Sequence, residues 1–411
     1  MPAAPGPSGW GGDRRLGPAL EDALLAAGRD DIAAESLTHP VHAYPARLHP
    51  ATAGRLVEIL MDGAPRGAAV LDPFCGSGTV LVEARAAGWR AFGVDLNPLA
   101  VRLARVKTWT APVPRRKRAR ELGRGIAGDV LVAGREARRA GAAAPPPVRA
   151  PEGFDPNARQ RRIGKWFAPH VRRELESIAG AIDEVAQDDA ELAEVLLMAL
   201  SGILYKVSHR RSDTDPSWVE RAVARGAAAR LFGDRVEMII AGLDDLARVP
   251  GPLPQVFEAD ARALDTLKLP PVRAVITSPP YAGTYDYAEQ HRLRFDFLGI
   301  RHRAFAEGEL GARRSFVANS AAATTRWRAG LGDAVSALVG ALEVGGLAAL
   351  VVGDSIAGRP CFADEDLRAV LDDRVEVVGW AWQARPKLGP ERHLFGDRPK
   401  REHIIVLHRA R

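Results

Sequence analysis

Two apolar runs that end in conformationally special loops carry the residues best suited to chemistry. Residues 70–79 read VLDPFCGSGT and residues 276–281 read ITSPPY. Glycines 76 and 78 allow a positive φ and let a ligand approach the backbone. The helix expected to follow the first loop begins with free N–H groups. We expect the first loop to hold a cofactor and the second to hold a planar, amine-bearing base.

Acidic residues follow three successive expected strands, at the edge where open α/β sheets bind ligands. Asp72 ends the first strand, Asp95 the second, and Asp260 follows the third. Asp95 is placed to accept hydrogen bonds from a ribose diol, and Asp260 to reach an adenine amine. A single aspartate here could simply cap a helix, but three favour a ligand site. The loop lacks the glycine pattern of dinucleotide sites and the lysine of triphosphate sites, so S-adenosylmethionine is the expected cofactor.

The second loop suits methyl transfer to an exocyclic amine. Such amines in cytosine or adenine are poor nucleophiles, because the nitrogen lone pair is conjugated with the ring. Pro279 and Pro280 lack N–H donors and fix φ, so they can aim carbonyl oxygens, with help from Ser278, at the amine hydrogens. Tyr281 offers a ring to stack on a base swung out of its duplex. Positioning and electrostatics, rather than a strong base, would do the work.

The order of strands and helices that must position these loops predicts a parallel α/β sheet with a long interruption. Apolar residues recur at three- and four-residue spacings between positions 166 and 246, which indicates helices. Residues 301–330 are polar and aperiodic, which predicts a mobile loop. The expected organisation is an N-terminal extension (1–35), a catalytic domain (36–110 and 251–411) and a mostly helical insertion (111–250).

Composition restricts the class of protein. The chain has 411 residues and a formal net charge of +6 at pH 7, which suits a polyanionic partner such as nucleic acid. Two cysteines favour a reducing compartment, and no Cys/His cluster has zinc spacing, so no metal is expected. No apolar run approaches the roughly 20 residues of a membrane span, and the start lacks a secretory pattern. We therefore expect a cytoplasmic protein with no membrane partner.

A basic run at the start of the insertion is the expected phosphate contact. It comprises Arg115, Arg116, Lys117 and Arg118. Lysine and arginine side chains that neutralise phosphates release counterions and so favour nucleic-acid binding. The alternative is a solvated surface, which is the commoner role of such runs.

Residues 72–79 and 278–281 resemble the cofactor and catalytic motifs of the amino-methyltransferases of nucleic acids. Residues 39–47, HPVHAYPAR, are similar to a block in one branch of bacterial DNA methyltransferases, where the Tyr-Pro-Ala segment closes over the cofactor's methionine end. The resemblance implies a class I, Rossmann-like methyltransferase sheet that uses S-adenosylmethionine on DNA. It also implies a restriction–modification setting with partner restriction or defence proteins.

The resemblance assigns a role to each matching residue. The implied cofactor-binding residues are Tyr44, Pro45, Asp72, Pro73, Phe74, Gly76, Ser77, Gly78, Thr79, Asp95, Asn97 and Asp260. The implied catalytic residues are Ser278, Pro279, Pro280 and Tyr281. In that family the serine form of the motif points to N4 of cytosine more than N6 of adenine.

Three other functions stay open from the sequence: an adenine-N6 DNA methyltransferase, an RNA base-amine methyltransferase, and a catalytically silent nucleic-acid-binding protein. The intact Asp72, Asp95 and 278–281 argue against the silent protein. The long insertion before the third strand departs from the family's better-known arrangement, which leaves the place of target recognition open.

Overall fold

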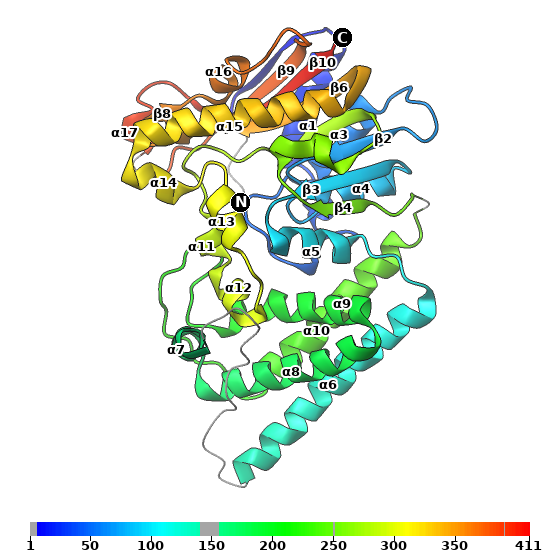
Figure 1. Ribbon diagram of the computed structural model, residues 1–411, viewed down its shortest axis with the longest axis vertical. Helices are drawn as coiled ribbons and strands as arrows, with labels where there is room; N and C mark the ends of the chain where they lie inside the picture. The colour runs from blue at the N-terminus through cyan, green and yellow to red at the C-terminus, as the bar shows by residue number, and fades with distance from the viewer. Residues whose placement is uncertain (1–5, 140–155, 250, 390) are drawn as a thin grey trace.

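The computed structural model describes residues 6–139, 156–249, 251–389 and 391–411. Within these residues the main sheet has eight strands (Figure 1). In spatial order they are β1 (Ser8–Gly12), β9 (Val375–Arg385), β10 (Lys400–Arg409), β6 (Leu342–Gly353), β5 (Val272–Thr277), β2 (Ala69–Asp72), β3 (Arg90–Asp95) and β4 (Gln255–Glu258). The five strands from β6 to β4 are parallel, and β10 runs antiparallel to both β6 and β9. The predicted α/β class with a large, mostly parallel sheet is confirmed.

Helices cover both faces of the sheet, which explains why its central strands read as continuous apolar runs. One face packs against α1 (Leu16–Ala26), α3 (Pro50–Leu60), α4 (Thr79–Ala86) and α5 (Pro98–Lys107). The other packs against η3 (Ala261–Leu267), α15 (Ser320–Ala341) and α16 (Ala363–Arg368). Every residue of β2 is buried. This three-layer packing fixes the carboxyl ends of β2, β3 and β5 at one edge.

The segment expected as an insertion forms a bundle beneath the sheet (Figure 1). Its helices are α6 (Val113–Arg139), α7 (Pro156–Trp166), α8 (Pro169–Asp188), α9 (Ala190–Ile203) and α10 (Ala227–Leu246), and the short η2 (Tyr205–Val207) lies between α9 and α10 in the chain. The bundle core also takes in Leu99 and Leu103 of α5, together with Phe295 and Phe297 of α12 (Arg292–Leu298). The bundle therefore packs against both parts of the chain that form the sheet, the one before the expected insertion through α5 and the one after it through α12.

Two segments differ from the sequence expectation. Residues 301–330 are not an irregular loop, because they contain α13 (Arg303–Gly308), α14 (Arg313–Ala318) and the start of α15. The helices α13 and α14 have six residues each and bury one side chain each, Phe305 and Phe316, which is too few for a periodic pattern. Residues 8–12 of the expected extension form β1, an edge strand of the main sheet paired with β9.

The remaining elements are short: α2 (Asp31–Glu35), η1 (His39–Val41), α11 (Tyr287–Gln290), β7 (Ser355–Ile356), β8 (Pro360–Cys361) and α17 (Glu391–Leu394). Among the helices of the described ranges, none combines the length and the apolar character that crossing a membrane requires.

Candidate cofactor and base site

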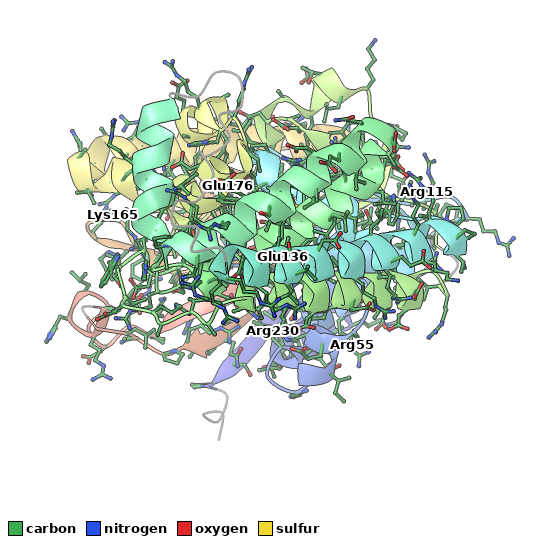
Figure 2. All side chains as sticks on the ribbon, turned by 90° about the horizontal axis from the view of Figure 1, so that it is seen from below. Arg55, Arg115, Glu136, Lys165, Glu176 and Arg230 are labelled. Atoms are coloured by element: carbon green, nitrogen blue, oxygen red, sulfur yellow. The ribbon has the colours of Figure 1, made fainter. Side chains whose placement is uncertain are left out.

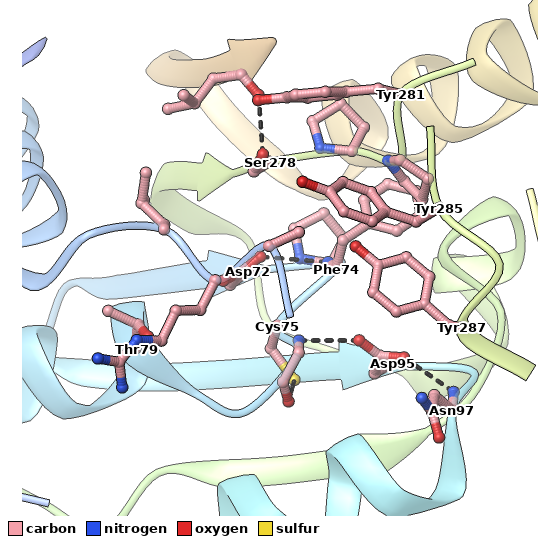
Figure 3. Close-up of a pocket in the computed structure, with 18 of the residues that line it drawn as sticks. Asp72, Phe74, Cys75, Thr79, Asp95, Asn97, Ser278, Tyr281, Tyr285 and Tyr287 are labelled. Atoms are coloured by element: carbon pink, nitrogen blue, oxygen red, sulfur yellow. Dashed lines mark hydrogen bonds between the residues drawn. The ribbon is translucent and has the colours of Figure 1, made fainter. Parts of the chain in front are cut away.

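A cavity of about 350 Å³ opens at the carboxyl ends of β2, β3 and β5 (Figure 3). Its volume lies within the range of small-molecule sites. The predicted residues in its wall are Tyr44, Asp72, Pro73, Phe74, Gly76, Ser77, Thr79, Asp95, Asn97, Asp260, Ser278, Pro279, Pro280 and Tyr281. Two further residues expected to bind the cofactor, Pro45 and Gly78, are not part of the wall that these residues form. The two loops that are far apart in the sequence therefore face one cavity.

Glycines give the first loop its shape. Gly76 has φ +49° and Gly78 has φ +84°, both in the left-handed region that glycine adopts without strain. A Cβ on Gly78 would lie 3.0 Å from Cβ of Ala104 in α5. Glycine at position 78 thus allows the turn into α4 and the close approach of α5.

Asp95 ties this loop to the end of β3. Its Oδ2 accepts a hydrogen bond from the Gly76 N–H at 2.8 Å, and its Oδ1 accepts one from the Asn97 N–H at 2.8 Å. Burial raises the pKa of Asp95 to about 6, although these backbone hydrogen bonds act in the opposite direction. The carboxylate is therefore held in a fixed position at a site that disfavours its charge.

Asp72 is likewise a buried carboxyl group that hydrogen bonds hold in place. Burial raises its pKa to about 7, against hydrogen bonds that it accepts from the Thr277 hydroxyl at 2.7 Å and the Phe74 N–H at 3.2 Å. Charge is costly in a low-dielectric site unless an opposite charge lies nearby. A cation in the cavity would favour the ionised forms of both Asp72 and Asp95.

Two hydroxyl groups of the loop have no hydrogen-bond partner among the residues that the structure describes. Ser77 Oγ and Thr79 Oγ1 are buried and find no hydrogen-bond partner within the described part of the chain. Buried polar atoms are usually satisfied, so these hydroxyls are available to a ligand. Tyr44 closes the loop from the other side: a Cβ on Gly76 would lie 3.3 Å from its ring, and its hydroxyl accepts a hydrogen bond from the Asn97 amide at 3.2 Å.

Asp260 is already paired in this structure. Arg262 Nε donates to its Oδ1 at 2.8 Å and Arg262 Nη2 to its Oδ2 at 2.5 Å. Burial opposes ionisation, but these hydrogen bonds lower the pKa of Asp260 below its ordinary value. Both side chains line the cavity. An adenine contact by Asp260 therefore stays a prediction, and Arg262 would have to share the carboxylate.

The second loop is held by contacts to β6 and α15. Ser278 Oγ donates to the Val351 carbonyl at 3.0 Å (Figure 3). The Pro280 carbonyl accepts a hydrogen bond from the Trp327 indole at 3.0 Å. Burial raises the pKa of Tyr281 above its ordinary value, so the phenol stays neutral. A Cβ on Gly353 would lie 2.7 Å from the Tyr281 ring, so this glycine makes room for it.

The cavity wall includes residues that were not predicted as site residues. Tyr285 and Tyr287 follow the second loop and line the cavity. Their ring centroids are 5.4 Å apart, and the Tyr287 ring stacks near Tyr44 at 6.2 Å. The sequence signal for them is the Tyr-Asp-Tyr string at 285–287, which closely follows the second loop.

Two charged residues of the wall come from the C-terminal strands. Arg385 of β9 and Glu402 of β10 line the cavity, and Arg385 Nε lies 3.1 Å from Glu402 Oε2. They face the same space as Ser278 to Tyr281. No local pattern marks either residue, because pairing of β9 with β10 brings them together.

The basic run has internal partners. Arg115 contacts Asp189 at 2.6 Å and Glu191 at 2.9 Å. Arg116 is buried, and its Nε lies 2.6 Å from Asp244 Oδ1. Figure 2 shows Arg115 at one end of the helical bundle. The first two residues of the run therefore hold α6 against α9 and α10, which differs from the sequence expectation of a surface open to phosphates.

The last two residues of the run remain open to solvent. Lys117 and Arg118 are exposed, and the Lys117 ammonium lies 3.9 Å from Glu121, one turn along α6. Exposed pairs of this kind are weak. Phosphate contact therefore stays a prediction for Lys117 and Arg118.

Part of the chain is similar to a family of known proteins. Residues 29–106 match the N6/N4 methyltransferase family, described as DNA methylase. The type II methyltransferase M.MvaI of Kocuria varians is 31% identical over 179 residues, which cover 44% of this chain and 36% of that protein. The chain thus spans little more than a third of the length of this curated relative. The resemblance to N6/N4 DNA methylases is confirmed, and the family match covers the first loop but not the second.

Solved structures give more distant likenesses. TrmN from Thermus thermophilus has a TM-score of 0.35 and 13% identity, and the match covers 90% of this chain and 52% of that one. The rRNA methyltransferase AviRa from Streptomyces viridochromogenes has a TM-score of 0.32 and 12% identity, covering 92% and 93% of the two chains. At these scores the likenesses support no statement about function.

Proposed function

We propose that this protein transfers a methyl group from S-adenosylmethionine to an exocyclic amine of a DNA base, with cytosine N4 as the target. The main support is that the Asp72–Thr79 loop and the Ser278–Tyr281 loop line one cavity. Further support comes from the family match over residues 29–106. Because its relative is a type II methyltransferase, we also propose a restriction–modification setting.

The first loop fits this cofactor. When bound, S-adenosylmethionine supplies an electrophilic methyl group on a positively charged sulfur. Asp72 and Asp95 would face a cationic ligand. Burial raises their pKa values to about 7 and about 6, and a nearby positive charge would offset the unfavourable free energy of ionising them. Asp95 would accept hydrogen bonds from the ribose hydroxyls. The unpartnered hydroxyls of Ser77 and Thr79 would hydrogen-bond the cofactor's polar end.

The second loop would hold the base. Since Trp327 already binds the Pro280 carbonyl, the Ser278 and Pro279 carbonyls are left to accept the hydrogens of the amine. That contact favours a more tetrahedral nitrogen with its lone pair directed at the methyl group. Tyr285 and Tyr287, which line the cavity beside the loop, offer rings for stacking in addition to Tyr281. The proton leaves after transfer, so the reaction requires positioning more than a strong base.

The reaction is tested by incubating the protein with radiolabelled cofactor and duplex DNA, followed by digestion to nucleosides. Label in N4-methylcytosine is the expected result. Label in N6-methyladenine would overturn the target base but keep the reaction, and label in 5-methylcytosine would overturn both. An equal amount of RNA serves as the parallel substrate, and label in RNA alone would replace DNA as the partner.

A matched variant separates the chemistry from cofactor binding. Pro279→Ala restores an N–H and frees φ, so we expect turnover to fall while the dissociation constant for S-adenosylmethionine is unchanged. Equal turnover in the variant would remove the loop's carbonyl geometry from the mechanism.

A further inference from the structure

Three potential metal ligands converge outside the cofactor cavity. Asp354 follows β6, Asp364 lies in α16 and His403 lies in β10. Their ligand atoms all lie within 4.8 Å of one another. His403 is 3% exposed and Asp354 is 5% exposed. None of these three residues lines the cavity described above, and the proposed methyl transfer gives them no role.

His403 adds an imidazole nitrogen to the two carboxylates of this cluster. Its Nε2 is buried and has no hydrogen-bond partner within the described residues, whereas buried polar atoms usually have one. It points at the two carboxylates, 3.6 Å from Asp354 Oδ1 and 4.0 Å from Asp364 Oδ1. Both separations are too long for a hydrogen bond.

The same separations suit a shared ion. Ligand atoms at about 2.1 Å from a tetrahedral metal stand about 3.4 Å apart, so a small contraction of the three side chains would fill three of the four positions around the ion and leave the fourth to water. We propose that Asp354, Asp364 and His403 bind one divalent transition-metal ion, of which Zn²⁺ is the test case. The imidazole nitrogen favours such ions over Mg²⁺ and Ca²⁺, which prefer oxygen ligands.

The surroundings hold the first carboxylate in place. Asp354 Oδ1 accepts a hydrogen bond from the Ala363 N–H at 3.0 Å, and its Oδ2 accepts one from the Arg401 N–H at 2.9 Å. Such contacts orient a ligand before the metal arrives. The Arg401 guanidinium lies 4.0 Å over the Trp382 ring, and Arg398 pairs with Glu365 at 2.6 Å. Arg398 and Arg401, the basic residues near the start of β10, therefore interact with groups outside the three-residue cluster.

The position of the site suggests a structural role behind the second loop. Gly353, which precedes Asp354, packs on the Tyr281 ring. The wall of a small second cavity includes Gly353 and Ala363 together with Pro279 and Pro280. A metal ion would join the ends of β6 and β10 to α16 and so brace the wall against which this loop rests.

The ligand spacing explains why the sequence predicts no metal. The three residues stand at positions 354, 364 and 403, without the short Cys or His spacings that mark zinc sites. Only the pairing of β10 with β6, which places His403 opposite Val352, brings the histidine to the end of β6.

The test uses the full-length protein stripped with a chelator and titrated calorimetrically with Zn²⁺, and separately with Mg²⁺. We expect one equivalent of Zn²⁺ to bind and to raise the melting temperature, and Mg²⁺ to do neither. The visible spectrum of bound Co²⁺ should report nitrogen and oxygen ligands in a low-symmetry site. Absence of stoichiometric Zn²⁺ binding would overturn the proposal.

Variants assign the site to these residues. His403→Gln and Asp364→Asn should each weaken Zn²⁺ binding at least tenfold and abolish the shift in melting temperature. Asp364 is partly exposed, so its variant should fold even where the buried His403→Gln does not. The control is His408→Gln, on the same strand with Nδ1 3.4 Å from Glu376, which should bind as wild type. Unchanged affinity in Asp364→Asn would mean that the cluster is only a buried ion pair.

Discussion

Asp72 and Asp95 keep two carboxyl groups in the wall of the cavity at positions where burial opposes their ionisation. Hydrogen bonds from the protein itself hold both carboxyl groups in place, so neither side chain can rotate out of its buried position. Such groups are frequent at functional sites, because a ligand of opposite charge recovers the unfavourable free energy. Their titration is therefore the most direct report of what the cavity binds.

The affinity for S-adenosylmethionine should rise with pH. The pKa values of Asp72 and Asp95 are about 7 and about 6 in the free protein, and the cationic ligand prefers the ionised carboxylates. Below its pKa each carboxyl must release a proton before it can pair with the ligand, which weakens binding about tenfold for every pH unit. The dissociation constant should therefore fall about a hundredfold through Asp72 between about pH 5 and 8, and about a further tenfold through Asp95. Isothermal titration in buffers of different ionisation enthalpy measures both the affinity and the proton release.

The demethylated product is the control for charge. S-adenosylhomocysteine lacks the positive sulfur and should show a shallower rise with pH over the same range. Parallel pH profiles for the two compounds would mean that the sulfonium does not face these carboxylates.

Replacing Asp95 by alanine should weaken cofactor binding. Losing a charged hydrogen bond costs about 1.5–3 kcal/mol, which is roughly tenfold to a hundredfold in affinity. Asp95 also anchors the Gly76 and Asn97 N–H groups, so Asp95→Asn, which retains one acceptor oxygen, is the matched variant and should lose less. Wild-type affinity in Asp95→Ala, measured by calorimetry, would refute the contact with the ribose.

At the scale of elements, the two loops were predictable because each is a local feature. Glycines 76 and 78 adopt the positive φ that their position suggested, and the prolines of 279–280 follow a strand, β5, whose apolar run is plain in the sequence. Arg385 and Glu402 were not predictable, because only the pairing of two distant strands makes them neighbours. Likewise Arg116 meets Asp244 only through the packing of α6 on α10.

The C-terminal strands should contribute to the reaction through Glu402. Its carboxylate and the Arg385 guanidinium line the cavity beside Ser278 to Tyr281. Glu402→Gln removes a charged acceptor worth about 1.5–3 kcal/mol, so we expect at least a tenfold loss of turnover on DNA with the cofactor affinity retained. The matched control is Glu376→Gln on β9, which pairs with His408 instead and should turn over normally. Equal rates in all three proteins would exclude Glu402 from the active site.

The basic residues of α6 should fall into two groups, one that stabilises the fold and one that binds DNA. Arg116→Ala removes the hydrogen bonds that this side chain donates to Asp244 and to the Ala111 carbonyl. It should therefore lower the free energy of unfolding by about 1–3 kcal/mol. Lys117→Ala with Arg118→Ala should leave thermal unfolding unchanged and reduce the slope of log affinity against log salt by about 0.9 for each lost phosphate contact. An unchanged slope would make Lys117 and Arg118 a solvated surface only.

At the scale of the whole molecule, the helical bundle shares one core with helices α5 and α12 of the sheet-forming part. Buried residues of α8, α9 and α10 pack with Leu99 of α5 and Phe295 of α12. Periodicity showed that the bundle is helical but not which of its faces meets α5 and α12, since an apolar stripe does not name its partner. We propose the boundaries 111–250 for the insertion, and expect it to unfold together with the sheet.

Arg294 makes several polar contacts within this shared core. It lies in α12, with a side chain 1% exposed, and its Nη2 is 2.9 Å from Asp213 Oδ2 in the segment between η2 and α10. Its Nε donates to the Ser201 carbonyl at 3.3 Å, and its guanidinium lies 4.6 Å over the Tyr205 ring. Helix α12 in turn follows the second loop and Tyr287 in the chain. The guanidinium therefore links the bundle to the base side of the cavity.

Arg294→Ala should destabilise the whole protein and impair methylation of DNA. Removing one partner of a buried ion pair leaves the other uncompensated, at a cost of about 3–5 kcal/mol, so we expect one cooperative unfolding transition at a clearly lower temperature. The control is Arg292→Ala on the same helix, where a partly exposed pair with Glu289 at 2.7 Å should contribute less than about 1 kcal/mol. Differential scanning calorimetry separates the outcomes. If Arg294→Ala instead gave two transitions, one of them at the wild-type temperature, the bundle would be an independent domain and the shared core would not couple it to the active site.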